Sequence, residues 1–266
     1  MHKFELGLLG GGNMATAIVD GVIRSGVLTP DKIIVSDPSR DRRDYFNAAG
    51  VKATDDNAEL FTDAEYILLA VKPQVAAQIL GEYNGKVQNK FISIMAGFSK
   101  AKIKSLLGDV KVARIMPNTA AMVGEAMSAI DSTEFNAAER EFLYNIFNTL
   151  GKAAEIPENM FDAVTAVSGS GPAYIYMFIK AMIDGGIAAG LSEEDSKTLT
   201  LQTVIGGVKM VKHNSDTPID TLIDRVCSKG GTTIQAVDYY RDKGLENIII
   251  EGMKRCKARS EELGRL

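Results

Sequence analysis

Cysteine and histidine are scarce in this sequence of 266 residues, which contains two of each. Cys227 and Cys256 form no CxxC motif, so we expect neither a disulfide framework nor a metal site, and this usage fits a reducing cytoplasm. His2 lies at the N-terminus and His213 lies in a polar stretch. The protein is therefore not expected to be an alcohol dehydrogenase of the kind that transfers protons through a histidine.

Excess positive charge and long apolar runs are also missing. The formal net charge of -4 argues against a nucleic-acid partner, although Arg40, Arg42 and Arg43 form a local basic cluster. The longest apolar run, residues 173–191, is interrupted by charged residues and glycines, so we expect no membrane span. The N-terminal segment is too short and too quickly glycine-rich for a signal peptide, and we expect a cytoplasmic location.

The first half of the chain alternates between continuous apolar runs and amphipathic segments. The apolar runs predict strands at residues 4–9, 32–36, 66–71, 91–95, 111–115 and 152–156. Helical patterns are predicted between them, at residues 13–25, at residues 41–49 and in a helix that begins with residues 74–80. This alternation is typical of a parallel sheet covered on both faces. We therefore predict an α/β fold with an N-terminal Rossmann-type doubly wound parallel sheet.

From residue 158 onward the pattern is only helical. Helices are predicted at residues 161–167, 172–189, 193–212, 218–225, 231–241 and 246–262. We predict two domains, a dinucleotide-binding Rossmann domain at residues 1–153 and an all-helical domain at residues 154–266. Residues 173–189 are apolar on nearly all faces, and such a helix must be buried all round. This favours a C-terminal dimerisation domain over a compact helical bundle.

A glycine-rich loop follows the first predicted strand. Gly10, Gly12 and Ala15 match G-x-G-x-x-A between a strand and a helix. The first glycine permits a tight turn, the second lets the backbone approach a pyrophosphate, and the alanine lets the helix pack closely. The helix N-terminus offers N–H groups to phosphates. We therefore expect the loop to bind a dinucleotide rather than to form a purely structural turn.

The end of the second predicted strand bears on the choice of cofactor. An acidic residue there favours NAD, whereas a hydroxyl with nearby arginines favours NADP. The chain has both, with Ser36 and Asp37 followed by Arg40, Arg42 and Arg43. We predict NADPH and keep NADH as the alternative. A further alternative is that the arginines belong to the exposed face of the next helix.

The carboxyl ends of the later strands complete the expected cofactor site, because ligands of open parallel sheets bind there. Lys72 and Pro73 follow one strand, and Ala96 and Gly97 follow the next, where small residues leave room for a nicotinamide ring. The predicted cofactor residues are Gly10, Gly11, Gly12, Asn13, Met14, Ser36, Arg40, Asn57, Ala70, Val71, Lys72, Pro73, Ala96 and Gly97.

Three segments together resemble the pyrroline-5-carboxylate reductase family. They are GLLGGGNMATAI from Gly7, AVTAVSGSGPAY from Ala163 and VCSKGGTTIQAV from Val226. The resemblance runs over the full length and includes AVKP from Ala70 and ARIMPNTAAMVGEAMSAI from Ala113. The combination of SGSGPA with SxGGTT at this spacing is far more specific than the glycine loop.

The resemblance implies reduction of the C=N bond of 1-pyrroline-5-carboxylate to L-proline by hydride transfer from NAD(P)H, the last step of proline biosynthesis. A protonated cyclic imine is already electrophilic, so the enzyme must mainly orient the reactants and hold the substrate carboxylate. The family also implies a homodimer through the C-terminal helices, and a decamer built from such dimers.

The SKGGTT segment offers donors for that carboxylate. By match to the family motif, Thr233 is the catalytic residue that bonds the ring nitrogen, and Ser228, Gly230, Gly231 and Thr232 hold the substrate. Glycines ahead of a helix expose N–H groups that bind anions. Taken alone, the same segment is an ordinary helix N-cap with a glycine turn.

The SGSGPA segment also has two interpretations. Ser168, Ser170 and Pro172 are good helix-start residues, and the loop they form could equally close the substrate pocket. The chain departs from the family pattern at Lys229, where a proline is usual, and at Arg225, where an amide is common. No role is carried across at Arg225 or within residues 215–220, where the chain holds an extra residue.

Two other functions compete with the reductase. A β-hydroxyacid dehydrogenase would share the glycine loop and a helical second domain, but it needs a lysine followed by an asparagine early in the long helix. Lys180 lies well into that helix, and Asp184 stands four residues on. A non-catalytic dinucleotide sensor would not need a second anion-binding helix start such as SKGGTT.

Overall fold

The computed structural model describes residues 2–265 and divides into two compact units. The first unit runs to Ser170 and resumes at Cys256, and the second unit is formed by Gly171–Arg255. The predicted domain boundary at residues 153 and 154 instead marks the change from mixed to helical structure. It falls within the last strand of the sheet, Gly151–Glu155, and stays a prediction about domain organisation.

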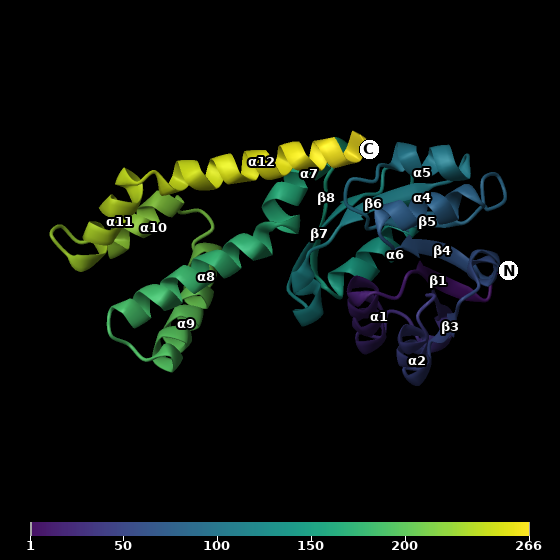
Figure 1. Ribbon diagram of the computed structural model, residues 1–266, viewed down its shortest axis with the longest axis horizontal. Helices are drawn as coiled ribbons and strands as arrows, with labels where there is room; N and C mark the ends of the chain where they lie inside the picture. The colour runs from purple at the N-terminus through teal and green to yellow at the C-terminus, as the bar shows by residue number, and fades with distance from the viewer. Residues whose placement is uncertain (1, 266) are drawn as a thin grey trace. The chain divides into compact units, whose positions relative to one another are not determined.

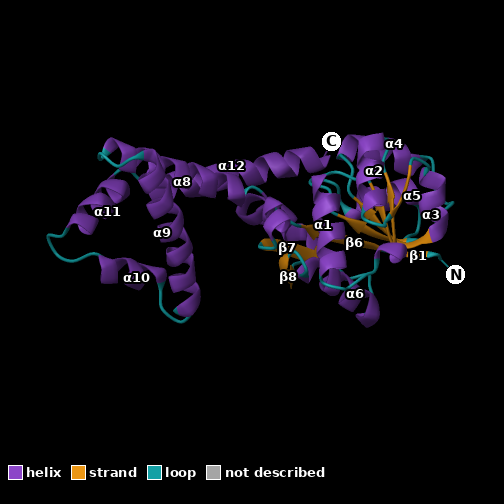
Figure 2. Ribbon diagram, turned by 90° about the horizontal axis from the view of Figure 1, so that it is seen from below, coloured by secondary structure: helices purple, strands orange, loops and turns teal. Residues whose placement is uncertain are grey.

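The first unit is built on one eight-stranded sheet (Figures 1 and 2). Its strands are β1 (Phe4–Leu9), β2 (Ile33–Ser36), β3 (Lys52–Thr54), β4 (Ala64–Leu69), β5 (Lys90–Ser93), β6 (Val112–Met116), β7 (Ala126–Asp131) and β8 (Gly151–Glu155). The strand order is β3-β2-β1-β4-β5-β6-β7-β8. The first six strands of that order are those of a dinucleotide-binding sheet, in which β1 and β4 are parallel and the order of the strands reverses between them.

The Rossmann-type α/β fold is confirmed, with one difference in the sheet. The six predicted strands are present, but β3 and β7 were not predicted. The sheet is also not wholly parallel, because β7 runs antiparallel to β6. A short connection with a 3₁₀ turn at Thr119–Val123 joins these two strands, and an antiparallel neighbour needs no crossover helix. The buried polar residues Ser128 and Asp131 weaken the apolar signal of β7.

Helices cover both faces of the sheet (Figure 2). They are α1 (Asn13–Arg24), α2 (Arg40–Ala48), α3 (Asn57–Asp63), α4 (Pro73–Gly81), α5 (Lys100–Leu107), α6 (Ala137–Asn148) and α7 (Phe161–Val164). Side chains of α1, α2 and α6, including Phe46 and Phe147, form one core cluster. Those of α3, α4 and α5 pack with Phe91 and Phe98 in the other. Burial of each of these phenylalanine side chains contributes about 1.5–3 kcal/mol to the stability of the fold, so the two cores hold the strand ends firmly in place.

The second unit is helical. It contains α8 (Gly171–Ala188), α9 (Glu193–His213), α10 (Ile219–Val226), α11 (Thr232–Asp242) and the first part of α12 (Leu245–Arg265). The helices α8 and α9 form an antiparallel pair, in which Ser196 Oγ donates to the carbonyl oxygen of Ile183 at 2.8 Å. A Cβ atom on Gly186 would collide with the Ser196 hydroxyl, so the close approach of the helices depends on this glycine.

The helix α8 leaves its apolar side chains uncovered within one chain. None of its residues is buried, and Tyr176 and Met177 are 62% and 72% exposed. The all-round burial expected for this helix is therefore not provided by the chain itself. Apolar surface of this extent on a folded protein marks an interaction site, in agreement with a dimerisation domain. No helix among the described residues combines the length and apolar character needed to cross a bilayer.

Candidate dinucleotide and substrate sites

The glycine loop lies at the switch point of the sheet, between β1 and α1. Gly10 has φ +99°, and a Cβ atom there would lie 2.7 Å from Val71 Cγ1 and 2.9 Å from the Ala70 carbonyl oxygen. Its N–H donates to the Ser36 carbonyl oxygen at 2.8 Å. This position therefore requires glycine for both its backbone conformation and its surroundings. Ala15 is fully buried, as expected for close packing of α1 on the sheet.

The next two glycines have different surroundings. A Cβ atom on Gly11 would lie 2.8 Å from Phe46 Cε2, whereas one on Gly12 would meet nothing within 4 Å. Gly12 is the N-cap of α1, which has no side-chain cap and no acidic residue in its first turn. Asn13 and Met14 are thus the first residues of an uncapped helix, and the space beside Gly12 is open. An uncapped helix start of this kind binds phosphate.

Ser36 and Asn57 meet at the end of β2. Ser36 is buried, and its hydroxyl donates to Asn57 Oδ1 at 2.6 Å. Asn57 is the first residue of α3, and its side chain is half-buried. The structure thus joins two predicted cofactor residues that are far apart in the sequence, with the Ser36 hydroxyl directed to Asn57.

The three arginines after β2 have different partners. Arg40 is the first residue of α2, and its side chain is 86% exposed beside Asp44. Arg42 Nε instead donates to the Gly11 carbonyl oxygen at 2.5 Å, and its Nη2 bonds the Thr16 hydroxyl. Arg43 donates to the Asp37 and Pro38 carbonyl oxygens. Arg42 and Arg43 therefore support the loops around the predicted cofactor site, and Arg40 extends into solvent.

The remaining predicted cofactor residues follow β4 and β5. The N–H of Ala70 donates to the Leu9 carbonyl oxygen at 2.9 Å, which continues the β1–β4 pairing to the edge of the sheet. Lys72 is exposed and is the N-cap of α4, with Pro73 at its first position. Ala96 is exposed and Gly97 has φ +68°. The predicted cofactor residues therefore gather at the carboxyl edge of the sheet in the first unit.

The SKGGTT segment lies in the second unit, between α10 and α11. Gly230 has φ +73°, and the N–H of Gly231 donates to the Ser228 carbonyl oxygen at 2.9 Å. A Cβ atom on Gly231 would collide with the Ser228 hydroxyl. Gly231 is the N-cap of α11 and supplies no side-chain cap, and no acidic residue lies in the first turn. Thr232 and Thr233 therefore begin a second uncapped helix, suited to an anion.

The SGSGPA segment is preceded by a π-helical turn at Thr165–Gly169. Such turns occur frequently at functional sites. Asn118 Nδ2 donates to Ser168 Oγ at 3.2 Å, while Asn118 Oδ1 caps the N–H of Ala120. The end of β6 is thereby tied to the loop that leads into α8.

Comparison with known proteins assigns both units. Residues 158–263 match the profile described as pyrroline-5-carboxylate reductase dimerisation, and residues 5–97 match that of NADP oxidoreductase, coenzyme F420-dependent. A pyrroline-5-carboxylate reductase of Synechocystis sp. is 40% identical over 99% of both chains. One from Arabidopsis thaliana is 38% identical over 98% of this chain and 97% of its own. This chain belongs to the pyrroline-5-carboxylate reductase family.

A solved member of the family shares the fold. The pyrroline carboxylate reductase of Plasmodium falciparum, crystallised with NADP bound, matches with a TM-score of 0.87 and 32% identity over 99% of both chains. The fold and family that the three sequence segments indicated are thus confirmed. The helical unit corresponds to the family's dimerisation domain, so the chain forms a homo-oligomer.

Two contacts of the glycine loop were not anticipated from the sequence. Asp37 was considered only as a reader of the cofactor ribose, but its Oδ2 accepts the N–H of Gly11 at 2.7 Å and its Oδ1 accepts that of Ser39 at 2.8 Å. Arg42 holds the other side of Gly11 through its carbonyl oxygen. An aspartate followed by proline and serine is a common turn signal, and it could have indicated a backbone-bonding role for Asp37.

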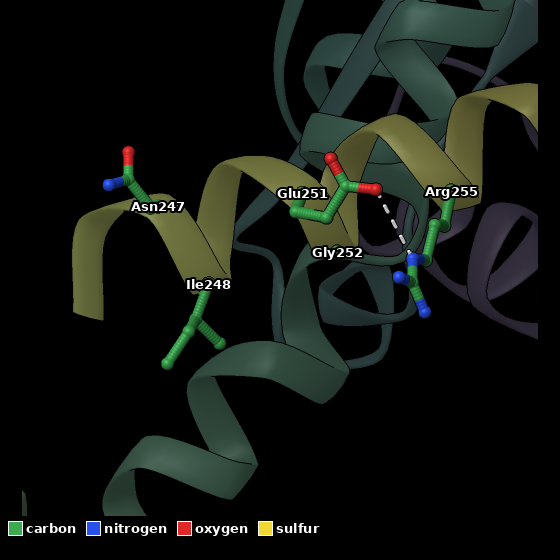
Figure 3. A pocket seen from close by; sticks show the side chains of 5 residues that line it. All are labelled: Asn247, Ile248, Glu251, Gly252 and Arg255. Carbon is green, nitrogen blue, oxygen red and sulfur yellow. Dashed lines mark hydrogen bonds and ion pairs between the residues drawn. The ribbon is translucent and has the colours of Figure 1, made fainter. Parts of the chain in front are cut away.

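One hollow of about 490 Å³ does not match the predicted sites. It runs along α12, where Glu251 and Arg255 form an ion pair at 3.3 Å (Figure 3). It is lined by residues 247, 248, 251, 252 and 255, none of which was predicted to bind substrate or cofactor. Within residues 2–265, no group of three or more His, Cys, Asp or Glu side chains is arranged to hold a metal ion.

Proposed function

We propose that this chain reduces the C=N bond of 1-pyrroline-5-carboxylate to L-proline, with NADPH as the hydride donor. Curated relatives that match this chain over nearly their full lengths are named pyrroline-5-carboxylate reductase, and a solved relative was crystallised with NADP bound. The observation in this chain that carries the proposal is the start of α11. It is a second uncapped helix N-terminus, preceded by Gly230 at φ +73° and followed by paired threonines.

The first unit supplies the cofactor-binding part of the mechanism. Residues 10–14 offer backbone N–H groups to the pyrophosphate, and Asp37 and Arg42 hold Gly11 in place. Arg40, which is 86% exposed at the start of α2, is the cation available to a 2′-phosphate. Ala96 and Gly97 leave room for the nicotinamide. When bound, NADPH supplies the hydride.

The second unit supplies the substrate-binding part. The N–H groups at Gly230 and Thr232 hold the carboxylate, with the Ser228 hydroxyl beside them. The N–H of Gly231 donates to the Ser228 carbonyl oxygen, so Gly231 contributes by shaping the turn rather than by donating to the substrate. Thr233 bonds the ring nitrogen and fixes the face of the iminium carbon that receives the hydride. Because the imine is electrophilic once protonated, orientation is the main requirement, and no histidine is needed.

The β-hydroxyacid dehydrogenase alternative is disfavoured by α8. Lys180 forms an ion pair with Asp184, and both side chains are largely exposed. A lysine that serves as a catalytic acid would be expected in a partly desolvated site. A pure dinucleotide sensor remains the other alternative, and turnover distinguishes it.

Oxidation of NADPH in the presence of 1-pyrroline-5-carboxylate, followed at 340 nm, tests the proposal. The wild-type chain should turn over, and Thr233→Ala should lower kcat/KM by about tenfold to a hundredfold, since one hydrogen bond to a charged substrate is lost. Thr233→Ser keeps the hydroxyl and should retain most activity. Binding of NADPH without turnover would favour a sensor, and equal loss of NADPH binding and turnover in Thr233→Ala would contradict the role of Thr233.

The assembly that we propose is a homodimer formed through the helices of the second unit, with a decamer of five dimers as the larger state. The exposed apolar side chains of α8 support the dimer. Light scattering after gel filtration distinguishes the two masses. We also propose a cytoplasmic location, which rests on the low cysteine content and is tested by cell fractionation.

A further inference from the structure

The last turns of α12 pack on the first unit through one face of the helix. Cys256, Ser260 and Gly264 recur at intervals of four residues, so they lie on the same side of α12. Cys256 Sγ donates to Ser170 Oγ at 3.3 Å, and Ser260 Oγ donates to Asp162 Oδ1 at 2.6 Å. All of these residues belong to the first unit. Ser260 is only 8% exposed, so its hydroxyl is shielded from water and donates to Asp162.

The same face of α12 reaches the loop after β5. A Cβ atom built on Gly97 would lie 3.5 Å from the Gly264 nitrogen and 3.5 Å from Leu263 Cβ, which is ordinary packing distance. Gly97, with φ +68°, is one of the two residues that we place beside the nicotinamide. The end of α12 therefore contacts a loop of the proposed cofactor site directly.

These contacts do not form a continuous packed surface. A pocket of about 260 Å³ lies among the loop after β5, β6, α7 and the last turn of α12. It is lined by Gly97, Ser99, Arg114, Asp162, Glu261 and Gly264. Because this pocket adjoins the contacts, the end of α12 is held in place by a few individual contacts rather than by a continuous packed surface. The strongest of them by geometry is the short bond from Ser260 to the Asp162 carboxylate.

We propose that Ser260 is a positioning residue for the cofactor. Its hydrogen bond to Asp162 holds the end of α12 against the loop at Gly97 and so fixes the nicotinamide end of the site. The inference rests on the proposed function for the identity of the cofactor. The phosphate loop does not depend on this contact, because Gly10 and Gly11 are held by Ser36, Asp37 and Arg42.

The test compares two ligands in the full-length protein at a temperature where every variant is folded. In Ser260→Ala, the Kd of NADPH should rise by about threefold to tenfold, the range expected when part of one hydrogen bond is lost. The Kd of adenosine 2′,5′-bisphosphate, which lacks the nicotinamide, should stay within about twofold. The kcat for imine reduction should fall with the weaker orientation of the hydride donor.

Two further variants separate positioning from stability. Asp162→Asn keeps the carbonyl acceptor for Ser260 and should retain NADPH affinity, whereas Asp162→Ala should reproduce Ser260→Ala and replaces it if that variant does not fold. Glu262→Ala, on the exposed side of the same helix, is the matched control. A lower melting temperature with both Kd values unchanged, or an equal rise in both, would overturn the proposal. A wild-type chain that binds NADPH but reduces no imine would contradict the proposed function, yet the binding comparison would still be decisive.

Discussion

The carboxylate of Asp37 accepts the backbone N–H of Gly11 at 2.7 Å, across 26 residues of sequence. The contact joins the end of β2 to the glycine loop, and the second carboxylate oxygen caps the turn at Ser39. One side chain therefore holds the loop in the conformation that leaves the N-terminus of α1 open. The acidic residue at this position therefore has a structural role in the loop, whether or not it also bonds the ribose of the cofactor.

Replacing Asp37 should weaken cofactor binding by loosening that loop. Asp37→Ala removes a hydrogen bond to a charged acceptor, which contributes about 1.5–3 kcal/mol, so the Kd of NADPH should rise by about tenfold or more. Asp37→Asn keeps one acceptor oxygen and should have a smaller effect. Fluorescence titration of NADPH measures both, with Asp41→Ala, an exposed carboxylate of α2, as the control. An Asp37→Ala variant with wild-type affinity would show that the loop holds its conformation without this contact.

The two motif glycines should respond differently to alanine. Gly10→Ala forces a side chain into a left-handed conformation and against Val71 and Ala70, so it should lower the free energy of unfolding by about 2 kcal/mol or more. Gly12→Ala places its methyl group in open space and should leave the melting temperature nearly unchanged. The same methyl group would keep the backbone from approaching the pyrophosphate, so NADPH affinity should fall strongly. Thermal unfolding together with NADPH titration distinguishes a structural glycine from a ligand-binding one.

The Lys100–Asp131 ion pair should make stability depend on acid pH. Lys100 Nζ lies 2.7 Å from Asp131 Oδ1, and both side chains are nearly buried. Burial alone would raise the pKa of Asp131, but hydrogen bonds from Lys100, Thr133 and the Glu158 N–H outweigh it and hold the pKa below its ordinary value. A carboxyl with a lowered folded pKa stabilises the protein above its unfolded pKa of about 3.9, and this contribution is lost as the pH falls through the folded pKa.

Asp131→Asn tests this directly. The variant should be less stable than the wild type at pH 7 by about 3 kcal/mol, because it leaves the Lys100 ammonium buried without its main partner. The difference should begin to shrink as the pH falls below the unfolded pKa of about 3.9, and it should be lost once the pH passes the lower folded pKa, where the native carboxylate is protonated. Urea unfolding at several pH values provides the measurement, and Asp109→Asn is an exposed control. A stability difference that stays constant down to pH 2 would rule out the ion pair as its source.

An acidic substitution on α8 should prevent assembly without unfolding the first unit. Met177 is 72% exposed in the single chain, and an aspartate there would be buried without a partner in a dimer. Met177→Asp should therefore shift the mass measured by light scattering toward the monomer while NADPH still binds. Lys180→Ala, one turn further along the same helix, is the control. An unchanged mass would place the interface elsewhere on the helical unit.

The elements that could be predicted are those with a strong local signal. The strands β1, β2, β4, β5 and β6 are mainly apolar, so the sequence itself indicates that they are buried on both faces. The strand β3 has three residues of mixed polarity, and β7 carries the buried polar residues Ser128 and Asp131. Their pairing energy comes from neighbouring strands rather than from their own composition, which is why a local pattern does not indicate them.

The sequence by itself determined the family, the order of the main elements and the two helix starts at Gly12 and Gly231, because glycine turns and apolar periodicity are local properties of the chain. The tertiary structure alone decided which side chains hold those starts in place. Asp37 and Gly11 are 26 residues apart, and Ser260 and Asp162 are 98 residues apart. Contacts over such separations depend on the packing of whole elements, so no spacing rule within the chain could have indicated them.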